Sequence, residues 1–121
     1  MRGTLPFPME NLLDLMVDMV CVVDPHGRFL YLNRSCEALL GCTPEELLGR
    51  YMIELVHPDD RGPTLLTVWR IMQGNPEMHF ENRYVRKDGR VVHVMWSARW
   101  SEEHQFRVAV GRDVSALREV G

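Results

Sequence analysis

MHFENRYVRKDGRVVHVMWSARWSEEHQFRVAVGRD, residues 78–113, is the most informative stretch of this sequence of 121 residues. It contains three runs rich in β-branched and aromatic residues, at residues 78–86, 91–100 and 106–113. Lys87-Asp88-Gly89 separates the first two runs, and a short glycine-containing segment between two β-prone runs favours a hairpin. The stretch therefore predicts three consecutive strands that form an antiparallel meander.

A second β-prone region lies closer to the N-terminus. Residues 19–23 and 29–32 are separated by Asp24-Pro25-His26-Gly27. In such a segment the proline presets the backbone for a turn, and the glycine accepts a positive φ. This region predicts a β-hairpin.

Helical patterns fill the sequence between the hairpin and the meander. Residues 34–40 have helical spacing, and Thr43-Pro44-Glu45-Glu46 has the pattern of a capping box with proline in the first turn. A longer helix is expected to begin near Asp60, to be capped by Asp59 or Asp60, and to run through Met72. The order of these elements predicts an α+β fold with one antiparallel sheet and its helices on one face.

The composition is that of an ordinary folded domain, with 45% hydrophobic and 26% charged residues. A net charge of −3 provides no positive field for a phosphate backbone, so nucleic-acid binding is not expected. Asp14 and Asp18 interrupt the apolar stretch 12–23, so no membrane span is expected either. The N-terminus lacks the pattern of a secretory signal, and the three cysteines form no CxxC pair, which predicts a cytoplasmic protein with reduced thiols.

Six short motifs occur in an order and at separations that together resemble a PAS domain, over about residues 17–115. They are Val23-Asp24-Pro25-His26-Gly27-Arg28, Tyr31-Leu32-Asn33, Leu40-Gly41-Cys42-Thr43-Pro44-Glu45-Glu46-Leu47-Leu48-Gly49, His57-Pro58-Asp59-Asp60, Arg86-Lys87-Asp88-Gly89 and Gly111-Arg112-Asp113-Val114-Ser115. The resemblance implies a PAS-like five-stranded antiparallel sheet, with short helices that form a cavity over its inner face. It also implies a sensory and dimerisation module of the kind found in histidine kinases and cyclic-dinucleotide enzymes, with no enzymatic activity of its own.

The resemblance divides the chain into an N-terminal flanking segment with an amphipathic helix (1–16), the PAS domain (17–115) and the start of a signalling linker (116–121). Asp113-Val114-Ser115 resembles the family's Asp-Ile-Thr junction between the last strand and an output helix. The expected function is to bind a small ligand and to relay a conformational change to an output domain, such as a kinase or a cyclase. Arg112 and Asp113 are expected to couple the sheet to that helix.

By analogy with the family, the even-numbered residues of the first two meander strands face the cavity, and so do Ala109 and Gly111 of the third. Asn82 and Tyr84 then become polar groups in an apolar pocket, the pattern of a ligand site. The residues expected to contact a ligand or cofactor are Trp69, Phe80, Asn82, Tyr84, Val94, Trp96 and Gly111. A filled core, in which the module serves only for protein interaction, is the alternative.

Non-covalent flavin is the leading specific ligand, because some flavin-binding PAS domains resemble this chain in having a Trp at the helix position of Trp69. Trp69 shares compatible spacing with Leu65, Leu66 and Met72. The covalent photochemistry of the light-oxygen-voltage subclass is excluded, because its reactive cysteine is missing from residues 49–56. Haem is less favoured because residues 62–73 contain no histidine, and no spacing of histidines and cysteines predicts a metal site.

An amphipathic helix is predicted over residues 9–19. Its apolar stripe comprises Leu12, Leu13, Leu15, Met16 and Met19. The inner core of a small domain is already filled from the other side of the sheet, so this stripe needs another partner. We expect a homodimer in which the helix packs on the outer face of the sheet.

Overall fold

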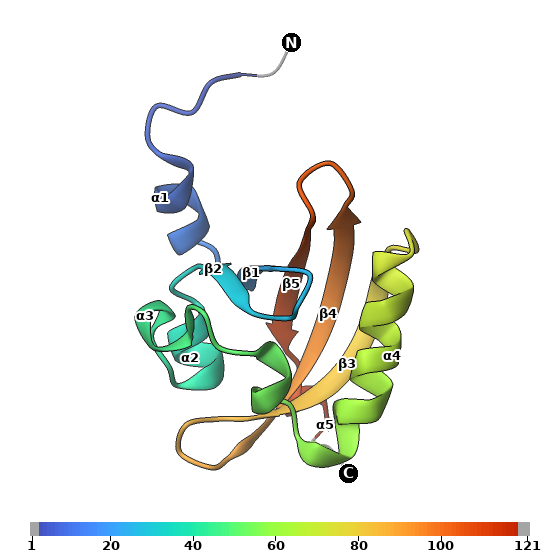
Figure 1. Cartoon of the computed structure of the whole chain (residues 1–121). Helices are drawn as coiled ribbons and strands as arrows, with labels where there is room; N and C mark the ends of the chain where they lie inside the picture. Colours follow the sequence, from blue (N-terminus) through green and yellow to red (C-terminus); the bar gives the residue numbers. More distant parts are fainter. Residues whose placement is uncertain (1–2, 119–121) are drawn as a thin grey trace.

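The computed structural model describes residues 3–118, which contain a five-stranded antiparallel sheet (Figure 1). The strands are β1 (Met19–Val23), β2 (Phe29–Leu32), β3 (Glu77–Val85), β4 (Val91–Ser101) and β5 (Phe106–Asp113). Their spatial order is β2-β1-β5-β4-β3, so the N-terminal hairpin lies beside the last strand of the meander. Both the hairpin and the meander are confirmed, and so is the α+β fold.

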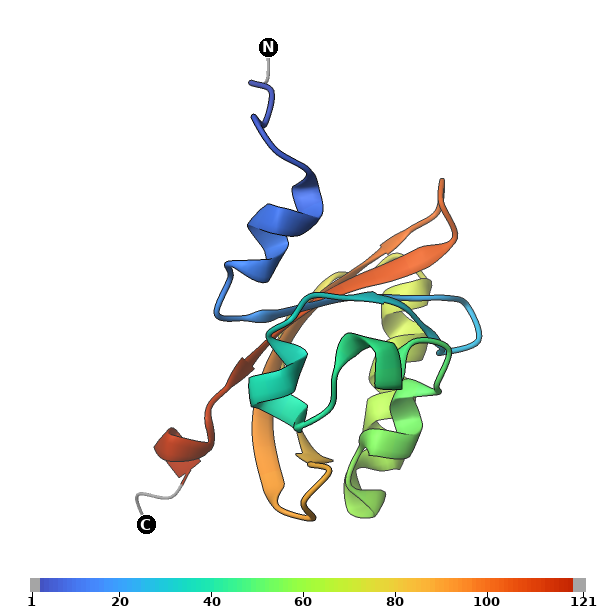
Figure 2. The same cartoon turned by 90° about the vertical axis from the view of Figure 1, so that its left-hand side faces the viewer.

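The helices that connect the hairpin to the meander cover one face of this sheet (Figure 2). They are α2 (Cys36–Leu40), α3 (Pro44–Leu47), the 3-10 turns η1 (Met52–Leu55) and η2 (Pro58–Asp60), and α4 (Arg61–Met72). The hydrophobic core lies between these helices and the inner sheet face, around Phe29, Leu40, Leu47, Val56 and Val94. Within residues 3–118, no helix is both long and apolar enough to cross a membrane.

The capping box at the start of α3 is present as predicted. The Glu46 amide donates to Thr43 Oγ1 over 3.2 Å, and the Thr43 amide donates to Glu46 Oε1 over 3.0 Å. Lys87, in the turn between β3 and β4, also binds the Glu46 carboxylate and lowers its pKa to about 2. A local helix start is thereby tied to a turn far away in the sequence.

The predicted carboxylate cap of α4 is wrong. Asp60 stands at the N-cap position, but its side chain makes no cap hydrogen bond. It accepts instead from the Arg83 amide and guanidinium on β3, both over 2.7 Å. The preceding 3-10 turn is capped by His57, whose Nδ1 accepts the Asp59 amide over 3.1 Å. Asp60 therefore fastens α4 to the sheet rather than starting the helix.

The helix predicted over residues 9–19 is shorter than expected. Helix α1 spans Met9–Asp14, and Met19 is the first residue of β1, where it is only 1% exposed and pairs with Gly111. The helix stops because the backbone beyond it is held by Asn33. The Asn33 Nδ2 donates to the Leu13 and Asp18 carbonyls, over 2.7 and 3.1 Å, and its Oδ1 accepts the Val20 amide over 2.8 Å.

We predict that Asn33→Leu lowers the free energy of unfolding by about 2–4 kcal/mol. The substitution leaves three backbone groups just before and at the start of β1 without their hydrogen-bond partner. Asn75→Leu is the control, since Asn75 is exposed and its side chain makes a single hydrogen bond, to the Arg70 carbonyl. Its effect should stay within about 0.5 kcal/mol. Urea denaturation of both variants measures this, and equal effects would contradict the role given to Asn33.

Candidate functional site

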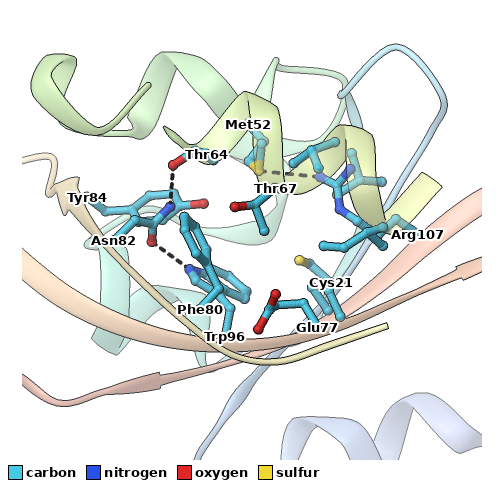
Figure 3. Close-up of a pocket in the computed structure, with 15 residues that line it drawn as sticks. Cys21, Met52, Thr64, Thr67, Glu77, Phe80, Asn82, Tyr84, Trp96 and Arg107 are labelled. Carbon is cyan, nitrogen blue, oxygen red and sulfur yellow. Dashed lines mark hydrogen bonds between the residues drawn. The ribbon is translucent and has the colours of Figure 1, made fainter. Parts of the chain in front are cut away.

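A small cavity lies between α4 and the inner face of the sheet, in the region drawn in Figure 3. Its volume is about 30 Å³, which is room for roughly one water molecule. The side chains that line it come from β1, η1, α4, β3, β4 and β5. They are Cys21, Val23, Met52, Thr64, Thr67, Val68, Ile71, Glu77, Phe80, Asn82, Tyr84, Trp96, Ala98, Arg107 and Ala109.

A row of two buried hydrogen bonds crosses one end of the cavity (Figure 3). The Trp96 indole Nε1 donates to Asn82 Oδ1 over 2.8 Å, and Asn82 Nδ2 donates to Thr64 Oγ1 over 3.1 Å. The Tyr84 and Trp96 rings pack beside it with their centroids 5.6 Å apart. These two hydrogen bonds join α4, β3 and β4, and they give both the nitrogen and the oxygen of the Asn82 amide a partner.

A guanidinium occupies the opposite side of the cavity. Arg107 projects inward from β5 and is only 3% exposed. Its Nη2 donates to the thioether sulfur of Met52 over 3.4 Å, which is a weak acceptor. Burial lowers the Arg107 pKa, although an arginine stays charged at physiological pH. The lining of the cavity is therefore mostly apolar, and its two charged groups are the Arg107 guanidinium and the Glu77 carboxylate.

A larger hollow of about 130 Å³ adjoins the cavity on its outer side. It lies between the β1–β2 turn, η1 and α4, and Pro25, Tyr51 and Leu65 are among its walls. Met52, Val68 and Arg107 line both spaces. These three side chains thus form the partition between the cavity and the hollow.

Four of the expected site residues line the cavity, whereas Val94 and Gly111 do not. Phe80, Asn82, Tyr84 and Trp96 point into it, as the alternation along β3 and β4 predicts. Val94 is fully buried in the core and does not reach the cavity. Gly111 faces inward, but a Cβ there would lie 2.8 Å from the Trp96 ring. The missing side chain at Gly111 therefore makes room for Trp96 rather than for a ligand.

The expected position of Trp69 in the cavity is wrong. Thr64, Val68 and Ile71 form the inner face of α4, and Trp69 lies on the opposite face, 59% exposed. Leu65 and Leu66 share this outer face and are about half exposed. The periodicity of α4 identified an apolar stripe correctly but could not tell which stripe faces the sheet, because both faces of this helix carry apolar residues.

Sequence reasoning overlooked Arg107 and Thr64. Arg107 has the same parity as Ala109 and Gly111 on β5, so the alternation that placed those residues inward also applied to it. A charged residue is seldom buried without a partner, which is why the pattern was not followed to this position. No local signal pointed to Thr64, whose role depends on its meeting with Asn82.

The cavity in this conformation does not fit the larger cofactors considered. A volume of about 30 Å³ has no room for a flavin or a haem, and Trp69 lies outside it. No histidine lines the cavity. In the described part of the chain, no three His, Cys, Asp or Glu side chains are grouped to hold a metal ion.

The end of β5 is tied to both flanks of the sheet. Arg112, which is expected to couple the sheet to the following helix α5 (Ser115–Arg118), forms an ion pair with Asp18 just before β1, with Nη2 3.1 Å from Oδ2. The Asp113 carboxylate accepts the Ser115 amide over 2.9 Å and so caps the turn into α5. The Ser115 hydroxyl in turn accepts the His93 amide of β4 over 2.9 Å. The junction is therefore held by β1 and β4.

The fold agrees with that of known proteins. The family model for the PAS fold matches residues 9–114, and the chain belongs to this family.

Among curated relatives, the chain is similar to the Basic helix-loop-helix ARNT-like protein 2 of Gallus gallus, at 30% identity over 106 residues. That match covers 78% of this chain and 17% of the relative. A shorter match of 48 residues, at 38% identity, relates it to the Blue light receptor lreA of Aspergillus flavus, and covers 40% of this chain and 6% of that protein. The chain thus spans less than a fifth of the length of these relatives.

Among solved structures, a domain of the sensory box sensor histidine kinase/response regulator from Geobacter sulfurreducens superposes with a TM-score of 0.74 at 23% identity. The alignment covers 85% of this chain and 89% of that domain. At this identity the likeness establishes the fold, and PAS family membership makes the chain a signal-sensing module.

We predict that Thr64→Val lowers the free energy of unfolding by about 1–3 kcal/mol, because the buried Asn82 amide loses its acceptor. Thr67→Val is a matched control, since Thr67 also lines the cavity but its side chain forms no hydrogen bond with the described residues. It should have an effect within about 0.5 kcal/mol. Thermal and urea unfolding compare the two variants, and an equal loss in both would rule out a special role for the Thr64–Asn82 bond.

Proposed function

We propose that this chain is the sensory module of a signalling protein, and that it binds a small molecule in the cavity under α4. The observation that carries the proposal is the partition formed by Met52, Val68 and Arg107 between the cavity and the outer hollow. Methionine is flexible and adapts to neighbours of different shape. A change of the Met52 rotamer is expected to join the two spaces into one site with a path to solvent.

The same site is connected to the end of β5, which suggests how binding is relayed. Trp96 is held by Asn82 at the cavity, and its ring lies against Gly111. The next residue, Arg112, binds Asp18 at the start of the hairpin. A ligand that moves the Trp96 ring would shift the backbone at Gly111 and so the position of α5. An output domain, such as a kinase or a cyclase, would respond to that shift.

A filled core is the second candidate, and the hydrogen-bond chain from Thr64 to Trp96 favours it. Thr64, Asn82 and Trp96 find hydrogen-bond partners in one another, and the remaining space holds roughly one water. In that case the module would act only through protein contacts. The unpaired charge of Arg107 has no explanation under this alternative, so we favour ligand binding.

We predict that the protein purified under native conditions releases a small molecule in stoichiometric amount on denaturation, as detected by mass spectrometry. An absorption spectrum of the same sample tests the cofactors considered from the sequence. Non-covalent flavin or haem would require α4 to move away from the sheet, and either would give a visible band. If the sample releases no small molecule and shows no visible band, the result supports the filled-core alternative instead.

We also propose that the chain forms a homodimer through α1 and its flanking residues. Helix α1 extends away from the sheet, on the side opposite α2–α4 (Figure 2), and has no buried residue. Large apolar side chains are exposed along this segment, namely Leu5, Phe7, Met9, Leu12, Leu15, Met16 and Val17. A second copy that covers this surface would bury an apolar area of a kind that monomers seldom expose. The buried free cysteines fit a reducing, cytoplasmic location for such a dimer.

We predict that the full chain is dimeric in light scattering at about 100 μM, well above the dissociation constant that burial of several leucines and methionines provides. Leu12→Ser with Leu15→Ser should yield a folded monomer, because both side chains are exposed within one chain. The matched control is Leu65→Ser with Leu66→Ser on the outer face of α4, which should remain dimeric. A monomeric wild type would overturn the proposal.

A further inference from the structure

Arg107 is a buried positive charge without a negative partner. It is 3% exposed, and within residues 3–118 no carboxylate lies within ion-pair distance of its guanidinium. Its hydrogen bond to the Met52 sulfur is long and weak for a charged donor. Buried charges in proteins are normally paired, because removal from water strongly disfavours an isolated ion.

The groups around Arg107 do not provide the missing charge. Cys21 and Tyr84 are its nearest titratable neighbours in the core, and burial raises the pKa of both, that of Cys21 to about 12. Both are therefore neutral at physiological pH. Glu77 lines the cavity, but it forms no ion pair with Arg107, and its Oε1 accepts the His79 amide over 3.2 Å.

The form of the site indicates the chemistry of its ligand. A guanidinium presents a planar fork of donors that matches the two oxygens of a carboxylate. A single carboxylate charge neutralises Arg107, whereas a phosphate dianion would leave an excess negative charge in a buried site. The remainder of the lining is mostly apolar, with Val68, Ile71 and Phe80 on the side of α4 and β3. Such walls suit a hydrocarbon or aromatic group.

We propose that the ligand of this module is a small organic acid, whose carboxylate pairs with Arg107 and whose apolar part lies in the cavity under α4. This inference rests on the proposed ligand-binding function and specifies the class of ligand. The acid reaches Arg107 from the hollow beside the β1–β2 turn, where the guanidinium forms part of the wall. The pair replaces the contact with Met52, whose movement opens the partition.

The test compares acids with alcohols of the same shape on the full chain. Hexanoate and benzoate are the probes, with hexan-1-ol and benzyl alcohol as neutral counterparts, and binding is followed by calorimetry and by thermal unfolding. We expect the acids to bind and to raise the melting temperature of the wild type, and the alcohols to do neither. Arg107→Met should weaken acid binding by at least about ten-fold, because it removes the charged fork but keeps an unbranched apolar stem.

Arg99→Met is the matched control, because Arg99 lies exposed on β4 and forms no ion pair with the described residues. It should bind the acids like the wild type. Arg107→Met without ligand should be at least as stable as the wild type, since an unpaired buried charge has been replaced by an apolar group. If that variant does not fold, the Nε–H resonance of Arg107 in the wild type, which should shift on addition of hexanoate, gives an independent readout.

The outcomes separate this inference from the function on which it rests. Equal binding of acids and alcohols, or of acids to wild type and Arg107→Met, would overturn the inference and leave a small-molecule site in place. A ligand without a carboxylate, identified by mass spectrometry after denaturation, would do the same. No binding of any probe, no shift of the Arg107 resonance and no released molecule would overturn both.

Discussion

The antiparallel pairing of β1 with β5 is the contact on which the rest of this structure depends. It joins the first strand of the chain to the last, so that two separate hairpin systems become one sheet with a continuous inner face. Asn33 fixes where β1 begins, because it binds backbone groups on both sides of the turn after α1. The start of β1 at Met19 in turn sets the register of the β1–β5 pairing, in which Gly111 lies at one end and Arg107 at the other.

The inner face created by this pairing has an uneven distribution of polar groups. On the side of β3 and β4, both the nitrogen and the oxygen of the Asn82 amide have a partner, in Thr64 and Trp96. On the side of β5, the Arg107 guanidinium has the Met52 thioether as its one hydrogen-bond partner among residues 3–118. A satisfied network stabilises and rigidifies its surroundings, whereas an unpaired charge is a cost to folding that a bound anion would relieve. The contrast places the responsive part of the site near Met52 and Arg107, and the rigid part near Trp96.

Much of this could be predicted from local patterns. The period of two along β3 and β4 correctly brought Phe80, Asn82, Tyr84 and Trp96 to one face, since a strand cannot present neighbours to the same side. The capping box at Thr43 and Glu46 also formed as expected, because its partners are three residues apart. The same approach failed for Trp69 because α4 has apolar residues on two faces, and the choice between them depends on contacts with the distant strand β3.

The sequence by itself determined the order of strands and helices, the turns between them and the parity of the cavity face. These follow from backbone preferences and side-chain alternation, which act over a few residues. Only the tertiary structure decided that Asp60 binds Arg83 instead of capping α4, that the N-terminal helix ends at Asp14, and that the buried Arg107 donates to the Met52 sulfur. Each of these depends on groups far apart in the chain, whose meeting is governed by the packing of the whole sheet against its helices.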